Sequence, residues 1–232
     1  ALPICPELNF NPQLPEIESY HCVKVLRMKS GDKLTVTDGK GYFYNCTLLD
    51  ANPKYSTVSI LNRVRAFKKG NFNLQLAFSP TKQMDRNEWF IEKATELGID
   101  KFIPVISSYS ERKEIKTERL KKTAISAMKQ SLKSYLPEID EPIKFHDFIS
   151  IPFDGKKFIA HCHDLPKKPL VQSYIKGQNA LIIIGPEGDF SKEEVNEASK
   201  NGFIPISLGE SRLRTETAAL VASHSIHVLN HY

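Results

Sequence analysis

The chain has few cysteines and no long apolar run, and each of these two features argues against particular classes of protein. Its 232 residues include four scattered cysteines with no Cys-x-x-Cys pair, Cys5, Cys22, Cys46 and Cys162. This spacing argues against a zinc ribbon or a thioredoxin-like motif and fits reduced thiols in a cytosol. No eighteen consecutive apolar residues occur, and the start ALPICPELNF lacks the features of a signal peptide. The sequence therefore predicts a cytoplasmic protein without a membrane span.

Several common catalytic motifs are also missing. The chain has no Gly-Lys-Ser/Thr P-loop, no Gly-x-Gly-x-x-Gly and no Gly-x-Ser-x-Gly, which disfavours the NTPase, dinucleotide-binding and hydrolase classes. His161 and His163 follow an apolar strand, and His224 and His227 share a helix face, but neither pair has a further ligand at metal-binding spacing. We expect no metal site, and we expect the second pair to pack at a helix or subunit contact.

Positive charge is concentrated in two zones. The net charge is +5, and residues 1–70 carry ten Lys and Arg against six Asp and Glu, while residues 101–133 carry nine against three. Two basic zones on an otherwise balanced chain favour a polyanionic partner, although solvated helix faces are the alternative.

Two types of pattern divide the chain near residue 70. KLTVTDG, YFYNCTLLD and KYSTVSILNRV are β-branched or aromatic runs separated by turn residues, which predict a small β-barrel in residues 1–70 after a loosely ordered start of about twenty residues. Residues 71–232 alternate strands with helices, which predicts a parallel sheet with helices on both faces. The expected strands are FNLQLAFS, FIPVIS, KFIAHC, LIIIG and FIPISLG, and the expected helices are 85–97, 116–135, one from about residue 192 and one from about residue 215.

Two of the most apolar strands end in glycine-bearing turns. One turn is Gly185-Pro186-Glu187-Gly188 and the other is Leu208-Gly209-Glu210. Because ligands of open α/β sheets bind beyond the carboxyl ends of the strands, we expect both turns to line one crevice. Ser191 and Glu194 form a predicted capping box for the helix that follows the first turn.

The charges of these turns leave two interpretations open. Glu187 and Asp189 would repel an anion, so a neutral or positively charged ligand fits the first turn, whose acids otherwise serve only to stabilise a helix N-terminus. Arg214 precedes the last helix, where a cation is electrostatically unfavourable. It either forms a salt bridge with Glu216 or Glu187, or faces the crevice and acts on charge there.

Five segments together resemble the RsmE family, the SPOUT-class methyltransferases that modify N3 of a uridine in 16S ribosomal RNA. They are IGPEG (184–188), LG…LRTETA (208–218), KATELGI (93–99), HCVKVLRMKSGD (21–32) and KQS…P (129–137). The resemblance implies an RNA-binding, PUA-like β-barrel in residues 1–70 and a SPOUT α/β domain with a C-terminal trefoil knot in residues 71–232. It also implies a homodimer, S-adenosylmethionine as cofactor and the small ribosomal subunit as partner.

The resemblance assigns roles to particular residues. Arg214 is the catalytic candidate, because an arginine can stabilise negative charge that develops on uracil. Lys24, Arg27 and Lys82 are the candidates for RNA binding, with other basic residues near them. Two candidates remain for the group that removes the proton from uracil N3, water and Glu187. The implied cofactor-binding residues are Ile184, Gly185, Pro186, Glu187, Gly188, Leu208, Gly209, Leu213 and Arg214.

Three positions depart from the family pattern. Asp189 stands where a second glycine is common, and Lys129 and Lys133 stand where Glu and Arg are usual. Two alternatives to the uridine methyltransferase therefore remain, a non-catalytic RNA-binding protein and a methyltransferase for another RNA base.

Overall fold

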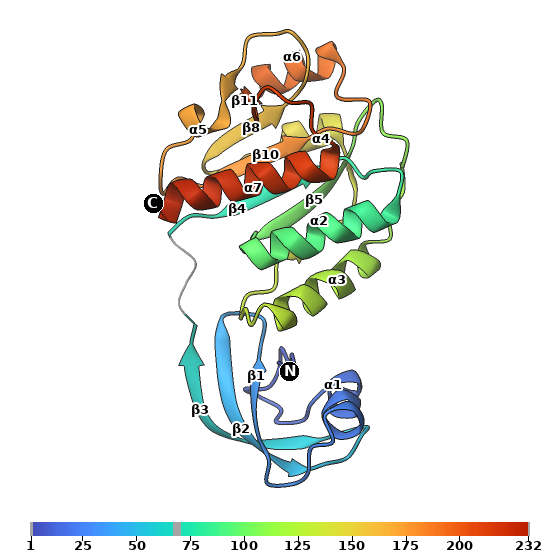
Figure 1. The fold of residues 1–232 in the computed structure, drawn as a ribbon, viewed down its shortest axis with the longest axis vertical. Coiled ribbons are helices and arrows are strands. Elements are labelled where there is room, and N and C mark those ends of the chain that lie inside the picture. Colours follow the sequence, from blue (N-terminus) through green and yellow to red (C-terminus); the bar gives the residue numbers. More distant parts are fainter. Residues whose placement is uncertain (1, 67–70, 232) are drawn as a thin grey trace. The chain divides into compact units, whose positions relative to one another are not determined.

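The computed structural model describes residues 2–66 and 71–231 (Figure 1). The chain forms two compact units, one of Ala1–Lys68 with Ile125–Leu136 and the other of Lys69–Ala124 with Pro137–Tyr232. The predicted boundary at residue 70 lies outside the described residues. Across the described ranges, every helix is too short or too polar to cross a bilayer.

The first unit is built on an antiparallel sheet of three strands in the order β1-β2-β3. These strands are β1 (Lys33–Thr37), β2 (Tyr42–Asp50) and β3 (Thr57–Arg65), preceded by α1 (Glu16–Tyr20) and the π-helical turn η1 (His21–Val25). The predicted turn at Asp38-Gly39 is confirmed: Gly39 has a φ of 71° and the Asp38 carboxylate accepts the amides of Lys40 and Tyr42. A short polar side chain before a glycine thus closes the β1–β2 hairpin.

The segment before α1 is ordered, so the expectation of a loose start is wrong. Leu2, Ile4, Cys5, Leu8 and Leu14 are all buried. Backbone bridges join this segment to the sheet at Ile4–Thr37 and Gln13–Thr57. A sheet of only three strands needs further apolar residues packed against it to be stable, and the N-terminal segment supplies part of this core.

The second segment of this unit contains the end of α3 (Thr117–Gln130), which is shorter than the predicted helix 116–135. The helix ends because Leu132 adopts a φ of 54°, and the amide of Lys133 turns back to the carbonyl of Met128. Lys129 places its ammonium 2.7 Å from the carboxylate of Glu18, a residue that is only 4% exposed. This buried ion pair gives the unusual Lys129 a structural role within the first unit.

The second unit contains a parallel sheet in the order β6-β5-β4-β10-β8-β11-β9, with β7 paired to β5. All five residues of β10 are buried, as its continuous apolar sequence predicts for a central parallel strand. The parallel α/β prediction is confirmed. The strands are β4 (Leu74–Phe78), β5 (Lys101–Ile106), β6 (Glu138–Ile139), β7 (Ile143–Lys144), β8 (Lys156–Ala160), β9 (Lys168–Pro169), β10 (Ala180–Ile184) and β11 (Phe203–Ser207).

Helices cover both faces of this sheet. Ala77 of β4 packs in one apolar cluster with α4 (Phe145–Ile149) and α6 (Lys192–Lys200). Its neighbour Phe78 points to the opposite face, where its ring lies 4.6 Å from that of Phe90 in α2 (Met84–Leu97). Figure 1 shows α2 beside α7 (Thr215–His231) over this second face, with the short α5 (Leu170–Ser173) near the sheet edge.

The predicted helix ends are partly confirmed. Gly98 stops α2 with a φ of 88°, and Ser191 with Glu194 forms the complete capping box of α6. The predicted capping role of Asp85 is wrong, since α2 begins before it. Asn87 instead fixes the entry to α2, because its side-chain oxygen accepts the amide of Thr81 and its nitrogen donates to the Thr81 carbonyl.

Candidate functional site

A crevice of about 820 Å³ lies at the carboxyl ends of three neighbouring strands. Its walls come from the ends of β8, β10 and β11 and from the segment that leads into α7. Both glycine turns line it, as their positions after the strands predicted. The lining residues from these turns are Ile184, Gly185, Pro186 and Glu187 from the first, and Leu208, Gly209, Glu210, Leu213 and Arg214 from the second turn and its continuation.

The two turns are tied together by a buried hydrogen bond. The hydroxyl of Thr215, at the start of α7, donates to the carbonyl of Gly185 over 2.9 Å. The preceding carbonyl, that of Ile184, accepts the amide of Ser79 over 2.9 Å. The first turn is therefore held from two sides. Sequence reasoning missed Thr215, since only the fold brings its hydroxyl to a carbonyl thirty residues away.

The three glycines of the turns have different structural requirements. A Cβ on Gly185 would lie 3.1 Å from the ring of Phe190, and Gly209 has a φ of 123°, which strains any other residue. Gly188 stands apart from the crevice lining, and its Cβ would lie 3.1 Å from the Cβ of Tyr109. A larger residue at Gly188 would thus disturb Tyr109 before it reached a ligand.

Asp189 links the first turn to the end of β8. Its φ of 65° is a conformation that glycine adopts most easily and that aspartate tolerates better than most residues. Its carboxylate accepts the amides of Cys162 and Phe190, each over 2.8 Å. The departure from glycine therefore keeps the backbone conformation and adds a connection between two walls of the crevice.

The salt-bridge interpretation of Arg214 is wrong. Glu216 faces Arg86 instead, with 3.7 Å between carboxylate and guanidinium, and Glu187 accepts the backbone amide of Lys82 over 3.0 Å. Within residues 2–66 and 71–231, Arg214 has no carboxylate inside 4.0 Å. It is exposed and lines both the crevice and a second cavity of about 390 Å³. Its charge is available to a ligand.

His161 is a crevice residue that the sequence did not indicate. It is 5% exposed, and neither ring nitrogen has a hydrogen-bond partner in the described part of the chain. Burial lowers the pKa of His161, and the nearby Lys167 ammonium lowers this pKa further. At neutral pH the imidazole is therefore uncharged, with one donor and one acceptor on a wall of the crevice.

Comparison with known proteins agrees with this arrangement. The family model for the RNA methyltransferase domain matches residues 68–227, and the model for the RNA methyltransferase PUA domain matches residues 18–61. The "Ribosomal RNA small subunit methyltransferase E" of Bacillus subtilis is 28% identical over 222 residues, which are 90% of this chain and 86% of that protein. The chain belongs to the RsmE family of RNA methyltransferases.

Solved structures of similar proteins extend the similarity to the whole fold. A "probable rRNA-methyltransferase" from Porphyromonas gingivalis is 42% identical with a TM-score of 0.92, covering 99% of this chain and 98% of that one. A ribosomal RNA small subunit methyltransferase E from Neisseria gonorrhoeae, solved bound to S-adenosyl methionine, is 26% identical with a TM-score of 0.87, covering 99% and 97%.

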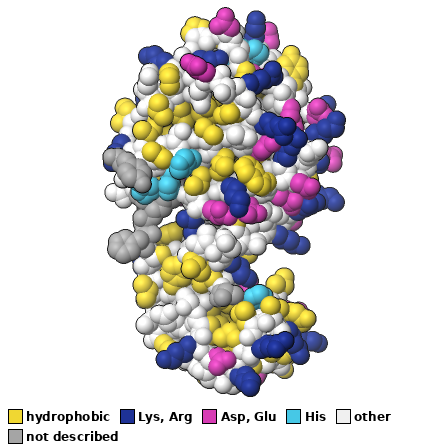
Figure 2. Space-filling model, viewed as in Figure 1, with side chains coloured by type: hydrophobic (Ala, Val, Ile, Leu, Met, Phe, Trp, Pro, Cys, Tyr) yellow, Lys and Arg dark blue, Asp and Glu magenta, His cyan; other side chains and the backbone are white. Residues whose placement is uncertain are grey.

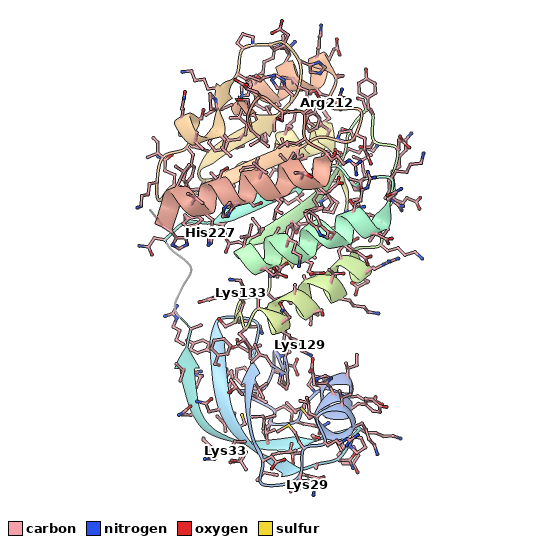
Figure 3. All side chains as sticks on the ribbon, viewed as in Figure 1. Lys29, Lys33, Lys129, Lys133, Arg212 and His227 are labelled. Atoms are coloured by element: carbon pink, nitrogen blue, oxygen red, sulfur yellow. The ribbon has the colours of Figure 1, made fainter. Side chains whose placement is uncertain are left out.

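The basic residues suggested by the RsmE resemblance lie in both units. Lys24 and Arg27 are exposed in the first unit, at and just after η1, and Arg27 has a φ of 57°. Lys82 is exposed in the second unit and forms an ion pair with Glu111 over 2.9 Å. Figure 2 shows lysines and arginines scattered over the visible face among acidic side chains. In Figure 3, Lys29 and Lys33 lie near the start of β1, while Lys129 and Lys133 lie at the end of α3.

Some of the other basic residues are occupied by contacts inside the second unit. The guanidinium of Arg112 donates to the carbonyls of Thr81 and Lys82, and Lys121 pairs with Glu118 over 2.8 Å. These two cations are therefore less suited to RNA phosphates than Lys24 or Arg27. In the two described ranges, no three His, Cys, Asp or Glu side chains gather closely enough to hold a metal ion.

Proposed function

We propose that this protein uses S-adenosylmethionine to methylate N3 of a uridine in 16S ribosomal RNA of the small ribosomal subunit. One observation carries the proposal: the two segments that resemble RsmE proteins most specifically, IGPEG and LRTETA, both line a single crevice. A relative of the same fold is solved bound to S-adenosyl methionine.

The crevice fits such a cofactor. Its volume of about 820 Å³ lies within the usual range of about 300–1,000 Å³ for small-molecule sites. The unpartnered nitrogens of His161 are suited to polar edges of a ligand, since buried polar groups are normally hydrogen-bonded. Glu187 and Asp189 favour a cation over an anion. When bound, the cofactor supplies a methyl group on a positively charged sulfur.

The proposed cofactor-binding residues divide by what the structure lets them do. Gly185 and Gly209 shape the turns, Ile184 and Leu213 supply apolar wall, and Gly188 acts by shaping the turn against Tyr109. The complete proposed set is Ile184, Gly185, Pro186, Glu187, Gly188, Leu208, Gly209, Leu213 and Arg214.

Arg214 is the proposed catalytic residue. Uracil develops negative charge on its carbonyl oxygens as N3 loses its proton, and a nearby guanidinium stabilises that charge. The absence of an ion pair within the described residues leaves the full charge of Arg214 for this purpose. Because Arg214 is exposed and supports no other side chain by an ion pair, its removal should spare the fold.

The finer architecture is part of the proposal. The three-stranded sheet would belong to a PUA-like β-barrel in residues 1–70 that binds RNA, with Lys24 and Arg27 contacting phosphates. Residues 71–232 would form a SPOUT domain whose C-terminal part is knotted, a rare chain topology, and Lys82 would contribute to RNA binding once released from Glu111. The enzyme would act as a cytoplasmic homodimer. The family membership and the RsmE relatives support each of these features.

Two alternatives remain outcomes of the test. A non-catalytic RNA-binding protein was suggested by Asp189, and the contacts of Asp189 weaken that suggestion because they preserve the turn. A methyltransferase for another RNA base would retain the crevice and change only the product.

The experiment measures transfer of tritiated methyl from S-adenosylmethionine to small ribosomal subunits that lack the uridine modification. We expect label in 3-methyluridine, and we expect Arg214→Ala to lose it while Lys176→Ala, which removes an exposed cation of the same unit, retains it. Label in a different nucleoside would select another base as substrate. Cofactor binding without any label would keep the crevice and point to a different RNA as substrate or to a non-catalytic protein. Turnover close to wild type in Arg214→Ala would remove Arg214 from the mechanism.

A further inference from the structure

A second cavity lies next to the crevice, within the second unit. Its volume is about 390 Å³, and it is lined by the start of α2 and the start of α7. Arg214 lines both spaces, so a molecule in the second cavity would adjoin one in the crevice. The lining residues are Asp85, Arg86, Trp89, Arg214, Glu216 and Thr217.

The carboxylate of Glu216 is incompletely satisfied. Glu216 is 7% exposed, and one of its oxygens, Oε1, lies 3.7 Å from Nε of Arg86. The other oxygen, Oε2, is buried and has no hydrogen-bond partner among the described residues. A buried carboxylate that lacks donors is unfavourable, and because Glu216 lines the cavity, a ligand bound there can supply a donor to this carboxylate.

The remaining walls are suited to a pyrimidine base. Trp89 is 43% exposed and offers an aromatic face for stacking, which is how proteins commonly hold an unpaired RNA base. Arg86 and Arg214 are hydrogen-bond donors that match carbonyl oxygens. Uracil carries one N–H between two carbonyls, so a cavity lined by one carboxylate and two arginines complements its edge. Cytosine has a lone pair at N3 and would be repelled by the same carboxylate.

We propose that this second cavity holds the target uracil and that the carboxylate of Glu216 accepts its N3 proton. This inference rests on the proposed function. The proton moves from N3 to the Glu216 carboxylate, and the electron pair left on N3 forms a bond to the methyl carbon held in the crevice. The methyl–sulfur bond breaks and its electron pair stays on sulfur, which becomes a neutral thioether. Arg214 faces both partners of this transfer.

The test compares Glu216→Gln with wild type in methyl transfer to small subunits across pH. Glutamine keeps the shape of glutamate and cannot take the proton, so we expect turnover to fall about 100-fold or more. The residual turnover should rise about tenfold per pH unit, because the uracil must then lose its proton to solvent, while wild-type turnover rises less steeply. Affinity for S-adenosylmethionine, measured by calorimetry, should be unchanged because the crevice is intact.

Two further variants keep the result interpretable. Glu193→Gln makes the same chemical change in the first turn of another helix, α6, at an exposed position, and should retain the wild-type rate and pH profile. Glu216→Asp keeps a carboxylate and should retain the shallow pH profile at a lower rate. If Glu216→Gln unfolds, the pH profile of Glu216→Asp decides whether Glu216 accepts the proton. A steep pH profile in that folded variant would overturn the role of Glu216 in proton transfer.

Stacking is tested separately through Trp89. Trp89→Ala should raise the KM for small subunits about tenfold and leave cofactor affinity unchanged, while Trp89→Phe should be milder. An unaltered KM in Trp89→Ala, or a wild-type pH profile in Glu216→Gln, would overturn the assignment of this cavity. These outcomes differ from failure of the proposed function, in which the wild-type protein itself would place no label in 3-methyluridine.

Discussion

The hydrogen bond from Thr215 to Gly185 offers a direct test of how the crevice is held together. Thr215→Val replaces the hydroxyl by a methyl group of similar size, so the main change is loss of one donor. Thr215 is 5% exposed, and the carbonyl of Gly185 loses the hydroxyl that lies 2.9 Å away. We therefore expect weaker stability and weaker cofactor binding in the same variant.

The expected magnitude follows from the burial of the bond. Leaving a buried acceptor without its donor costs about 1–3 kcal/mol of unfolding free energy. Because the bond also places the first turn against the start of α7, part of this free energy should be lost from binding as well. A loss of about 1.4 kcal/mol corresponds to a tenfold higher dissociation constant for S-adenosylmethionine.

Urea unfolding followed by tryptophan fluorescence measures the stability change in the relevant unit. The chain contains one tryptophan, Trp89, which lies in α2 of the same unit as Thr215. Calorimetric titration with S-adenosylmethionine measures the affinity.

A matched variant separates this bond from a generic loss of a threonine. Thr123 is only partly buried in α3, and its hydroxyl donates to the Arg119 carbonyl over 3.2 Å in a solvent-exposed hydrogen bond. Thr123→Val should change stability by no more than about 0.5 kcal/mol, as is usual at exposed positions. The reasoning fails if Thr215→Val is as stable as Thr123→Val and binds the cofactor as tightly as wild type.

Three other predictions concern His161, Cys162 and Arg27. Burial keeps the folded-state pKa of His161 below the usual value of about 6.5, so the unfolded chain binds this proton at a higher pH than the folded chain does. The free energy of unfolding should therefore fall as pH drops from about 6.5 toward the lowered pKa. Urea unfolding of His161→Gln should show a smaller fall, and an equal fall would contradict the burial argument. Cys162 is exposed and lines the crevice, whereas the other cysteines are buried and burial raises the pKa of Cys46 to about 11. A thiol reagent should therefore label one cysteine per native chain, and label it more slowly when S-adenosylmethionine is present. Labelling of several cysteines in the native chain would contradict this prediction. Arg27→Ala should weaken RNA binding and lower its salt dependence, measured as the slope of log affinity against log salt, and an identical slope would show that Arg27 does not contact phosphate.

Much of the second unit could be predicted from local pattern. Continuous apolar runs predicted strands such as β10, and Gly98 and the Ser191–Glu194 box marked helix ends through local backbone chemistry. The crevice could also be predicted, since two glycine turns after parallel strands must lie at the same edge of the sheet.

The predictions that were wrong concern residues whose contacts lie far away along the chain. The N-terminal segment looked irregular because its apolar residues have no helical or strand period, yet Leu8 and Leu14 are buried in the first core. The helix α3 ended early at Gln130, and Lys129 gained a buried partner in Glu18, more than a hundred residues away in the sequence. A pattern of neighbouring residues cannot predict a contact between residues so far apart in the sequence.

The sequence by itself determined the order of the main strands and helices of the second unit, the two glycine turns and the RsmE family, because these depend on residue type and on spacing over short distances. Only the tertiary structure decided that Glu216 pairs with Arg86, that Arg214 stays unpaired within the described residues, and that His161 is buried with both ring nitrogens unpartnered. The physical reason is that burial and charge pairing are set by which side chains the fold brings together, and separation along the chain does not specify that.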